Sequence, residues 1–278
     1  MAGKNVASDY DGRIRRAEYL ESVHPFAREV LSFYKHIAEF QKSLYVRMAG
    51  AGKQRGTGTT GKSDVLLRDD LKTDSLLPYF KDFLELVAAH GPAALADSAR
   101  QFSNGEPDSV ATLLQDYWNT SGRDDNPNAA FDQFLPRAFL QPYAEYLSGA
   151  PAAEEDSGAP SLCPYCGARP LLGVLRQEGD GGKRLLLCSF CLREWEFRRI
   201  ICATCGEETE KKLPVYVAEQ FPYLRVDACD TCKFYLRTVD LTRDGNAVPL
   251  VDDIAAIPLS LWAEEHGYSR AQANLLGT

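Results

Sequence analysis

Four cysteine pairs organise this chain, and they read Cys163-Pro-Tyr-Cys166, Cys188-Ser-Phe-Cys191, Cys202-Ala-Thr-Cys205 and Cys229-Asp-Thr-Cys232. The pairs contain all eight cysteines of the 278 residues, and 21, 10 and 23 residues separate one pair from the next. This long, short, long spacing divides the cysteines into two units: Cys163, Cys166, Cys188 and Cys191, then Cys202, Cys205, Cys229 and Cys232. Two such pairs at this kind of separation are typical of a metal site.

Four thiolates in each unit predict one metal ion in each unit. A Cys-x-x-Cys turn brings its two sulfurs to one side, and two facing turns form a tetrahedral thiolate cage. Gly167 and Gly206 follow the first pair of each unit. Because glycine adopts positive φ at little cost, backbone N–H groups can turn toward the sulfurs there. Zinc and iron both suit four sulfurs in this geometry, so the cysteines predict two ions and leave the element open.

Two other uses of the cysteines fit the sequence less well. Disulfides belong to oxidising compartments, and Arg15-Arg16 is not followed by the apolar stretch of an export signal. A thioredoxin-like redox pair normally opens a helix beside a βαβ unit, whereas these pairs have strand-like flanks. No apolar run reaches the roughly 18–20 residues that span a bilayer. We therefore expect a cytoplasmic protein without membrane insertion.

The charge of the chain argues against nucleic-acid binding by bulk attraction, which normally requires a basic face. The net charge is −8, with 17 basic and 23 acidic side chains in residues 1–160 and 14 and 16 in residues 161–278. One basic concentration predicts a solvated strand face or, alternatively, a partner-binding patch: Lys183, Arg184, Arg193, Arg198 and Arg199. Without paired carboxylates at catalytic spacing or an HExxH motif, we predict no catalytic residues and no enzyme.

Apolar residues at helical spacing fill the first half of the chain. Residues 14–46 carry one such stripe, with a kink or a new start at His24-Pro25. Further helical segments follow at 74–90, 95–104, 108–117 and 131–147, and prolines predict that the last is kinked or broken: Pro136 and Pro142. The sequence thus predicts an α+β multidomain fold with an all-helical domain at 1–148 and a linker at 149–160.

Residues 49–64 form a low-complexity segment rich in glycine and threonine. Gly56, Gly61, Lys62 and Ser63 formally satisfy the phosphate-binding pattern G-x-x-x-x-G-K-[ST]. That loop normally follows a buried strand and opens a helix, but here a helix precedes it. We predict a mobile inter-helix loop instead of a nucleotide site.

Each cysteine unit predicts a β-hairpin between its two cysteine pairs. The strand-like segments are 171–176 and 184–187, repeated by 213–218 and 223–226, with a further one at 234–241. Corresponding cysteines lie 39 and 41 residues apart, which indicates an internal repeat. We predict tandem metal modules at 161–200 and 201–245. A closing segment at 246–278 should pack Leu259, Leu261 and Trp262 onto one of the two domains.

These features together resemble the FdhE family, the formate dehydrogenase accessory proteins. A helical first half is followed by Cys163-Pro-Tyr-Cys166-Gly167, Cys188-Ser-Phe-Cys191 leading to Glu194-Trp195, Ile201-Cys202-Ala-Thr-Cys205-Gly206, and Cys229-Asp-Thr-Cys232-Lys233. Also similar are the helix with His24-Pro25 and Gln41, and the tail from Asp252-Asp253-Ile254-Ala255 through Leu261-Trp262 to Gly267-Tyr268. The resemblance covers nearly the whole chain, except the loop at 49–64.

The resemblance implies a cytoplasmic maturation factor, or chaperone, that formate dehydrogenase needs for activity but does not keep as a subunit. Its expected partner is the catalytic subunit of formate dehydrogenase. Its metal modules should be rubredoxin-like, and iron is the metal usually discussed for the family. Two alternatives remain: a rubredoxin-like redox protein acting on formate dehydrogenase, and a zinc-ribbon nucleic-acid adaptor using Arg193, Arg198 and Arg199.

Overall fold

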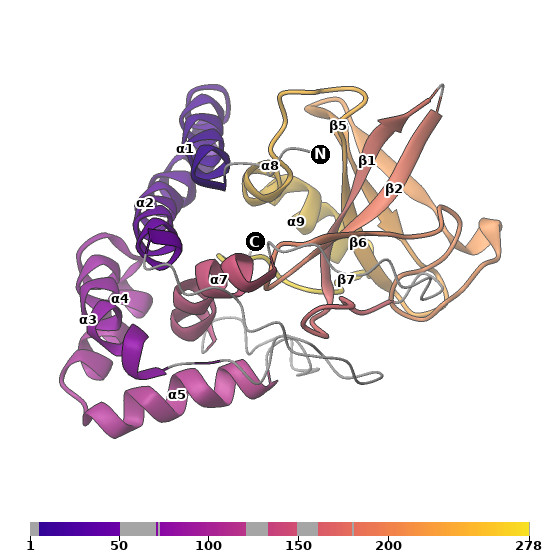
Figure 1. Ribbon diagram of the computed structural model, residues 1–278. Helices are drawn as coiled ribbons and strands as arrows, with labels where there is room; N and C mark the ends of the chain where they lie inside the picture. The colour runs from indigo at the N-terminus through magenta and orange to yellow at the C-terminus, as the bar shows by residue number, and fades with distance from the viewer. Residues whose placement is uncertain are drawn as a thin grey trace.

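The computed structural model describes residues 6–50, 71, 73–120, 133–148, 161–179 and 181–277. Helices make up the first half of the chain and a β-sheet most of the second half, which confirms the predicted α+β class (Figure 1). Most of the glycine-rich segment at 49–64 and the whole of the predicted linker at 149–160 lie outside the described residues.

The described helices of the first half follow the apolar stripes, except that the first begins at Val6, eight residues before the predicted start. They are α1 (Val6–Val23), the short 3-10 helix η1 (Pro25–Ala27), α2 (Arg28–Gly50), α3 (Thr73–His90), α4 (Ala93–Ser103), α5 (Pro107–Thr120) and α7 (Phe134–Ser148). The new start predicted at His24-Pro25 is confirmed, because Pro25 opens η1 between α1 and α2. None of the helices in the described ranges is long and apolar enough to cross a membrane.

Helix α7 runs without a break from Phe134 to Ser148, so of the two predicted outcomes, a kink or a break, the break is excluded. Pro136 lies in the first turn, where a backbone N–H has no partner within the helix and its loss costs little. Pro142 lies inside the helix and cannot donate to the carbonyl of Ala138 four residues earlier. The fully buried side chain of Gln41 on α2 donates to that carbonyl instead, at 2.7 Å.

The strands of both cysteine units join one sheet. They are β1 (Pro170–Glu178), β2 (Gly181–Cys188), β3 (Glu194–Glu196), β4 (Val215–Ala218), β5 (Phe221–Ala228), β6 (Phe234–Asp240) and β7 (Ser269–Arg270). The strand order is β3-β2-β1-β6-β5-β4, with β7 also paired to β6. Both predicted hairpins are confirmed as the antiparallel pairs β1–β2 and β4–β5.

A parallel pairing of β1 with β6 fuses the two units, and glycine makes this pairing possible. Gly173 on β1 lies opposite Thr238 on β6. A Cβ atom at Gly173 would lie 2.3 Å from Oγ1 of Thr238, far inside van der Waals contact. The nearest atoms all belong to the Thr238 side chain, so a larger residue at position 173 would have to displace that side chain, whose hydroxyl donates to Asp227.

Helices α8 (Pro249–Ala255) and α9 (Ile257–Glu265) lie between α1 and the sheet (Figure 1). The closing segment thus contacts both halves of the molecule, more than the sequence predicted. Leu259 is buried as expected, but Leu261 is 56% exposed, so its predicted packing is wrong. Two residues of helix correspond to about 200° of rotation, which places Leu261 on the opposite side from Leu259.

Helix α2 contributes to two hydrophobic cores from two sides. Phe33 and Ile37 belong to a core shared with α3, α4, α5 and α7. Leu31 and Tyr34 belong to a second core, formed with α1, α8, α9 and one face of the sheet. The first core also contains all four cysteines of the first unit, so that unit is buried against the helices.

Candidate metal centres

The eight cysteines gather into the two groups that their spacing predicts. One group contains Cys163, Cys166, Cys188 and Cys191, the other Cys202, Cys205, Cys229 and Cys232, and within each group all sulfur atoms lie within 4.8 Å of one another. We call them the first and the second cluster. No other such group of His, Cys, Asp and Glu side chains occurs among the described residues.

The sulfur separations fit a tetrahedral metal site. The Sγ atoms lie 3.6 Å apart for Cys163 and Cys191 and 3.3 Å apart for Cys166 and Cys188. In the second cluster, both Cys202–Cys232 and Cys205–Cys229 are separated by 3.7 Å. Four sulfurs about 2.3 Å from a central zinc ion would lie about 3.8 Å from one another. Both clusters therefore have the donor set and nearly the size that such an ion requires.

All four cysteine pairs lie in turns of one design. In each turn the N–H of the first cysteine donates at 2.8–3.0 Å to the carbonyl five residues later, at Ala168, Arg193, Glu207 and Phe234. The residue after the second cysteine has positive φ in every turn: 69° at Gly167, 55° at Leu192, 77° at Gly206 and 60° at Lys233. Backbone N–H groups approach sulfur, as Phe190 approaches Cys188 and Thr204 approaches Cys202, both at 3.4 Å.

Two of these four positions were not predicted from the sequence. Glycine at positions 167 and 206 indicates a left-handed backbone conformation. Leu192 and Lys233 adopt the same conformation, which costs about 1–2 kcal/mol for each residue. Their position directly after a Cys-x-x-Cys pair is the one available signal. Four cysteines that bind an ion would hold that turn in place, and this would offset the cost.

Four thiolates in the first cluster would need a cation beside them. Hydrogen bonds with Cys166 and the other thiols lower the pKa of Cys163, so the thiols alone favour a thiolate at that position. Burial raises the pKa of the Cys188 thiol well above its ordinary value. Contact with Cys163, followed by contacts with the other two thiols and burial, likewise raises the pKa of Cys191. Four thiolates therefore cannot share this buried space unless a positive ion compensates their charge. A divalent metal ion at the centre of the four sulfurs would supply that compensation.

Aromatic side chains of α5 and α7 cover the first cluster. Tyr117 and Trp118 of α5 both meet the ring of Phe190 edge to face, at centroid distances of 5.5 and 5.6 Å. Trp118 in turn packs on Tyr143 of α7. Because Phe190 lies between Cys188 and Cys191, this aromatic group seals one entire turn of the cluster from solvent.

Polar side chains of α7 hold the same turn by its backbone. Arg137 donates to the carbonyl of Ser189 at 3.2 Å, and Gln141 donates to it at 3.4 Å. Ser148 donates to the carbonyl of Cys191 at 3.2 Å. The sequence did not reveal these roles, although a charged residue within the apolar stretch around Phe134 and Phe139 was a usable signal at position 137.

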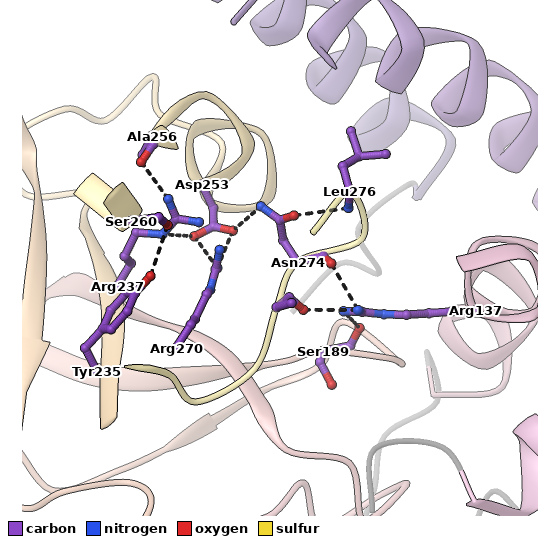
Figure 2. A network of polar contacts seen from close by, with 11 residues as sticks. Arg137, Ser189, Tyr235, Arg237, Asp253, Ala256, Ser260, Arg270, Asn274 and Leu276 are labelled. Atoms are coloured by element: carbon purple, nitrogen blue, oxygen red, sulfur yellow. Dashed lines mark hydrogen bonds and ion pairs between the residues drawn. The ribbon is translucent and has the colours of Figure 1, made fainter. Parts of the chain in front are cut away.

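A buried ionic network extends from this turn to the closing segment (Figure 2). Besides Ser189, Arg137 binds the carbonyls of Ala273 and Asn274, at 3.0 and 3.1 Å. The Asn274 side chain donates to Asp253 at 3.0 Å, as Figure 2 shows. Through Ala273 and Asn274, this network connects the first cluster to α8.

Asp253 of α8 is the centre of this network, and it is fully buried. It forms ion pairs of 2.8 Å with Arg237 of β6 and 2.7 Å with Arg270 of β7. Burial by itself raises the pKa of the carboxyl, but Arg237 and Arg270 outweigh it and hold the pKa below its usual value. Asp253 is therefore a permanent negative charge that joins the sheet to its covering helices.

The second cluster lies toward solvent. Cys205 is exposed and Cys202 and Cys232 are half-buried, while Cys229 is buried. In its second turn, Thr231 donates to the Glu207 carboxylate at 2.6 Å, so this contact comes from within the same unit. The two clusters thus share a local design and differ in their surroundings.

The basic concentration does not form one surface patch. Arg184 is 5% exposed and donates to the carbonyls of Arg198 and Ile201, at 3.0 and 3.1 Å. The guanidinium of Arg193 lies 3.5 Å from the ring centre of Tyr165 and donates to the carbonyl of Ser148. Arg184 and Arg193 therefore bind backbone carbonyls close to the cysteines. Neither of the two predictions, a solvated strand face or a partner-binding patch, describes all five basic residues.

Comparison with known proteins agrees with the cysteine pattern. A family model described as "FdhE, central domain" matches residues 162–199, and one described as "FdhE, C-terminal domain" matches residues 200–276. The chain is 26% identical to a "Protein FdhE homolog" of Aquifex aeolicus over 270 residues, which cover 95% of this chain and 94% of that protein. It is 32% identical to one of Pseudomonas aeruginosa over 224 residues, or 77% and 69% of the two chains.

The fold also has a counterpart among solved structures. The crystal structure of the FdhE protein from Pseudomonas aeruginosa matches with a TM-score of 0.67 and 26% identity, over 96% of this chain and 95% of that chain. Fold and clusters together define a class of protein in which a helical layer is joined to a sheet that carries two four-cysteine sites. Within that class, this chain belongs to the FdhE family.

Proposed function

We propose that this protein is an accessory factor that binds the catalytic subunit of formate dehydrogenase during its maturation in the cytoplasm, and that its eight cysteines hold two metal ions. Membership of the FdhE family supports the first part. The two groups of four cysteine sulfurs, each within 4.8 Å, support the second. Free thiols in such numbers suit a reducing compartment.

The metal ions, iron or zinc, would act by holding the fold. Each ion would bind the four sulfurs of one cluster, and structural metal sites supply folding free energy on the order of 10 kcal/mol in small zinc peptides. The cysteine turns carry unfavourable left-handed backbone at Leu192 and Lys233, which such binding would offset. On this proposal the eight cysteines bind metal and take part in no catalytic step.

The partner is tested by anaerobic affinity purification of the tagged protein from its own host grown with formate. Bound proteins are identified by mass spectrometry after washing at moderate salt. We expect the catalytic subunit of formate dehydrogenase, and an untagged strain gives the background. Recovery of nucleic acid or transcription proteins in its place would contradict the proposal and favour the nucleic-acid adaptor.

A sharper version compares two substitutions at the two clusters. Cys205→Ser removes a ligand on the exposed side, while Cys166→Ser removes one from the buried cluster. If the ions serve only the fold, capture of the catalytic subunit should fall with the loss of folded protein measured by circular dichroism. Capture that disappears while the fold is retained would instead favour direct contact through the cluster.

A redox function is the second candidate, and the exposure of Cys205 is the observation that favours it. Iron held by four thiolates at a solvent-facing site can exchange one electron with a docked protein, and solvent exposure tunes its potential. The protein isolated from its native host would then be coloured and would bleach reversibly on reduction. A colourless protein containing only zinc would exclude this candidate.

A further inference from the structure

The two clusters are repeats of one design with unequal access to solvent. In the first cluster Cys163 and Cys166 are each 2% exposed, and Cys188 and Cys191 are fully buried. In the second cluster only Cys229 is buried to that degree, and Cys205 is openly exposed. Because the cysteine turns are equivalent, this difference must come from what packs on them.

Corresponding residues of the second turns show the cause. Phe190 in the first cluster is 3% exposed beneath the rings of α5. Its counterpart in the second cluster is Thr231, which is exposed. The residue before it is buried Ser189 in the first unit and exposed Asp230 in the second. The sequence therefore distinguishes the two turns: Ser189 and Phe190 are buried in the first cluster, whereas Asp230 and Thr231 are exposed in the second.

The backbone of the first cluster is also fastened from outside its unit. Arg137 on α7 bonds the carbonyl of Ser189, and Ser148 bonds that of Cys191. The turn cannot open without breaking these buried bonds and separating the aromatic group. In the second cluster the N–H of Asp230 donates to the carbonyl of Lys212 at 2.8 Å, within the same unit. The closing segment reaches this turn through Tyr268, which donates to the exposed Asp230 side chain at 2.9 Å and not to a buried backbone carbonyl.

We propose that the second cluster is the exchange site of this protein, at which a metal ion is loaded from and released to external sulfur or nitrogen donors. The first cluster is closed to such exchange by α5 and α7. This inference rests on the proposed occupation of both clusters by metal. The two clusters then have different roles. The first cluster connects the helices to the sheet, and the second cluster exchanges its metal ion with ligands in solution or on a partner.

Cys205 is the residue through which exchange begins. Its thiolate is the exposed ligand of the cluster, so an incoming donor can replace its sulfur without displacing any helix. As the bond from Cys205 to the ion breaks and the bond from the incoming donor forms, the released thiolate takes up a proton from water. Repetition at the half-buried Cys202 and Cys232, and last at the buried Cys229, completes the transfer, with no change of oxidation state.

The test uses the intact metal-loaded protein under anaerobic conditions. An excess of EDTA is added, released metal is followed over time, and samples are pulsed with N-ethylmaleimide and mapped by mass spectrometry. We expect two phases of one equivalent each, with rates that differ at least about tenfold, because release from the first cluster needs local opening. When the first equivalent has left, the label should be confined to Cys202, Cys205, Cys229 and Cys232.

A matched pair of variants tests the cause. Phe190→Thr gives the first cluster the residue that the second cluster has, and should accelerate the slow phase alone by about tenfold or more. Thr231→Ala at the equivalent position of the second cluster should leave the slow phase unchanged. If Phe190→Thr does not fold, the labelling of the wild-type protein still decides the question.

Two results would overturn the inference. One is release from both clusters at equal rates, and the other is labelling of the first cluster before the second. Failure of the underlying proposal looks different, since the protein would then contain fewer than two equivalents of metal before any chelator is added.

Discussion

At the scale of single residues, Asp253 holds two cations inside the molecule. It neutralises Arg237 and Arg270, and both Asp253 and Arg237 are fully buried. Asp253→Asn leaves two buried cations without a counter-charge, so we expect a loss of about 3–5 kcal/mol in the free energy of unfolding. The measurement is denaturant unfolding of the metal-loaded protein.

The control for this substitution is Asp97→Asn on α4. Asp97 pairs with Arg100 at 2.7 Å, but its side chain is 69% exposed. Exposed helix pairs contribute about 0.3–0.5 kcal/mol. Equal losses for the two variants would show that the network around Asp253 does not stabilise the junction of sheet and helices.

We expect the stability of the folded protein to depend on pH through His24, which lies at the junction of α1 and η1. Its ring lies 4.7 Å from that of Phe221, and burial is the main cause that lowers its pKa. A histidine with a lowered pKa binds a proton more readily in the unfolded state, so its contribution to stability falls as the pH drops through about 6.5. His24→Gln should therefore lose less stability than the wild type between about pH 7.5 and 5.5. Unfolding midpoints at both pH values provide the comparison, and identical losses would refute this role.

At the scale of elements, the pairing of β1 with β6 depends on Gly173. Gly173→Ala places a methyl group against Thr238, and we expect a loss of about 1–3 kcal/mol from overpacking. Gly12→Ala on α1 is the matched control, because open space surrounds that position and alanine favours a helix. Thermal unfolding should move in opposite directions for the two variants.

A double-mutant cycle separates the clash from other effects. Thr238→Ala alone removes the hydroxyl that donates to Asp227 at 2.8 Å, and should be destabilising. Combined with Gly173→Ala it also removes the clashing atom, so the pair should cost less than the sum of the single losses by about 0.5–3 kcal/mol. Strict additivity would mean that the strands are not in close contact here.

The elements that could be predicted from sequence are those with a local signal. Helical stripes, the two strands of the hairpin β1–β2 and the grouping of cysteines all follow from spacing within a few tens of residues. The fusion of both units into one sheet has no such signal, because Gly173 and Thr238 are far apart in the chain. A glycine within a strand pattern is only a hint of close approach.

The surroundings of the clusters were unpredictable for a related reason. Spacing identified all eight cysteines, but Arg137 and Ser148 act on backbone carbonyls of a distant turn. Any residue offers a carbonyl, so the sequence of the turn does not reveal which side chain will bind it. The same holds for Gln41, which replaces the hydrogen bond that Pro142 cannot make.

At the scale of the whole molecule, the two clusters should differ in what their loss unfolds. The first cluster belongs to the core that includes α3, α5 and α7, so Cys163→Ser should lower helical circular dichroism and the melting temperature together. Cys205→Ser, at the exposed edge of the second cluster, should weaken the second unit and leave the helical signal nearly intact. The reverse order would contradict the observed burial.

The division of the chain into a helical domain, a linker, two modules and a closing segment stays a prediction. The observed contacts connect these parts extensively, since Arg137 joins α7 to both the first cluster and the closing segment. Limited proteolysis of the metal-loaded protein is the direct test. We expect cleavage within 149–160 if that stretch is the linker, with both fragments staying associated through these buried contacts.

Each of the two groups of four cysteines should hold one metal ion. Native mass spectrometry of the intact protein, purified without oxygen from its own host, measures this directly. We predict the mass of the chain with two metal ions, and eight alkylatable thiols after denaturation. The mass also distinguishes iron from zinc. A metal-free folded protein, or one whose cysteines are joined as disulfides, would contradict the account.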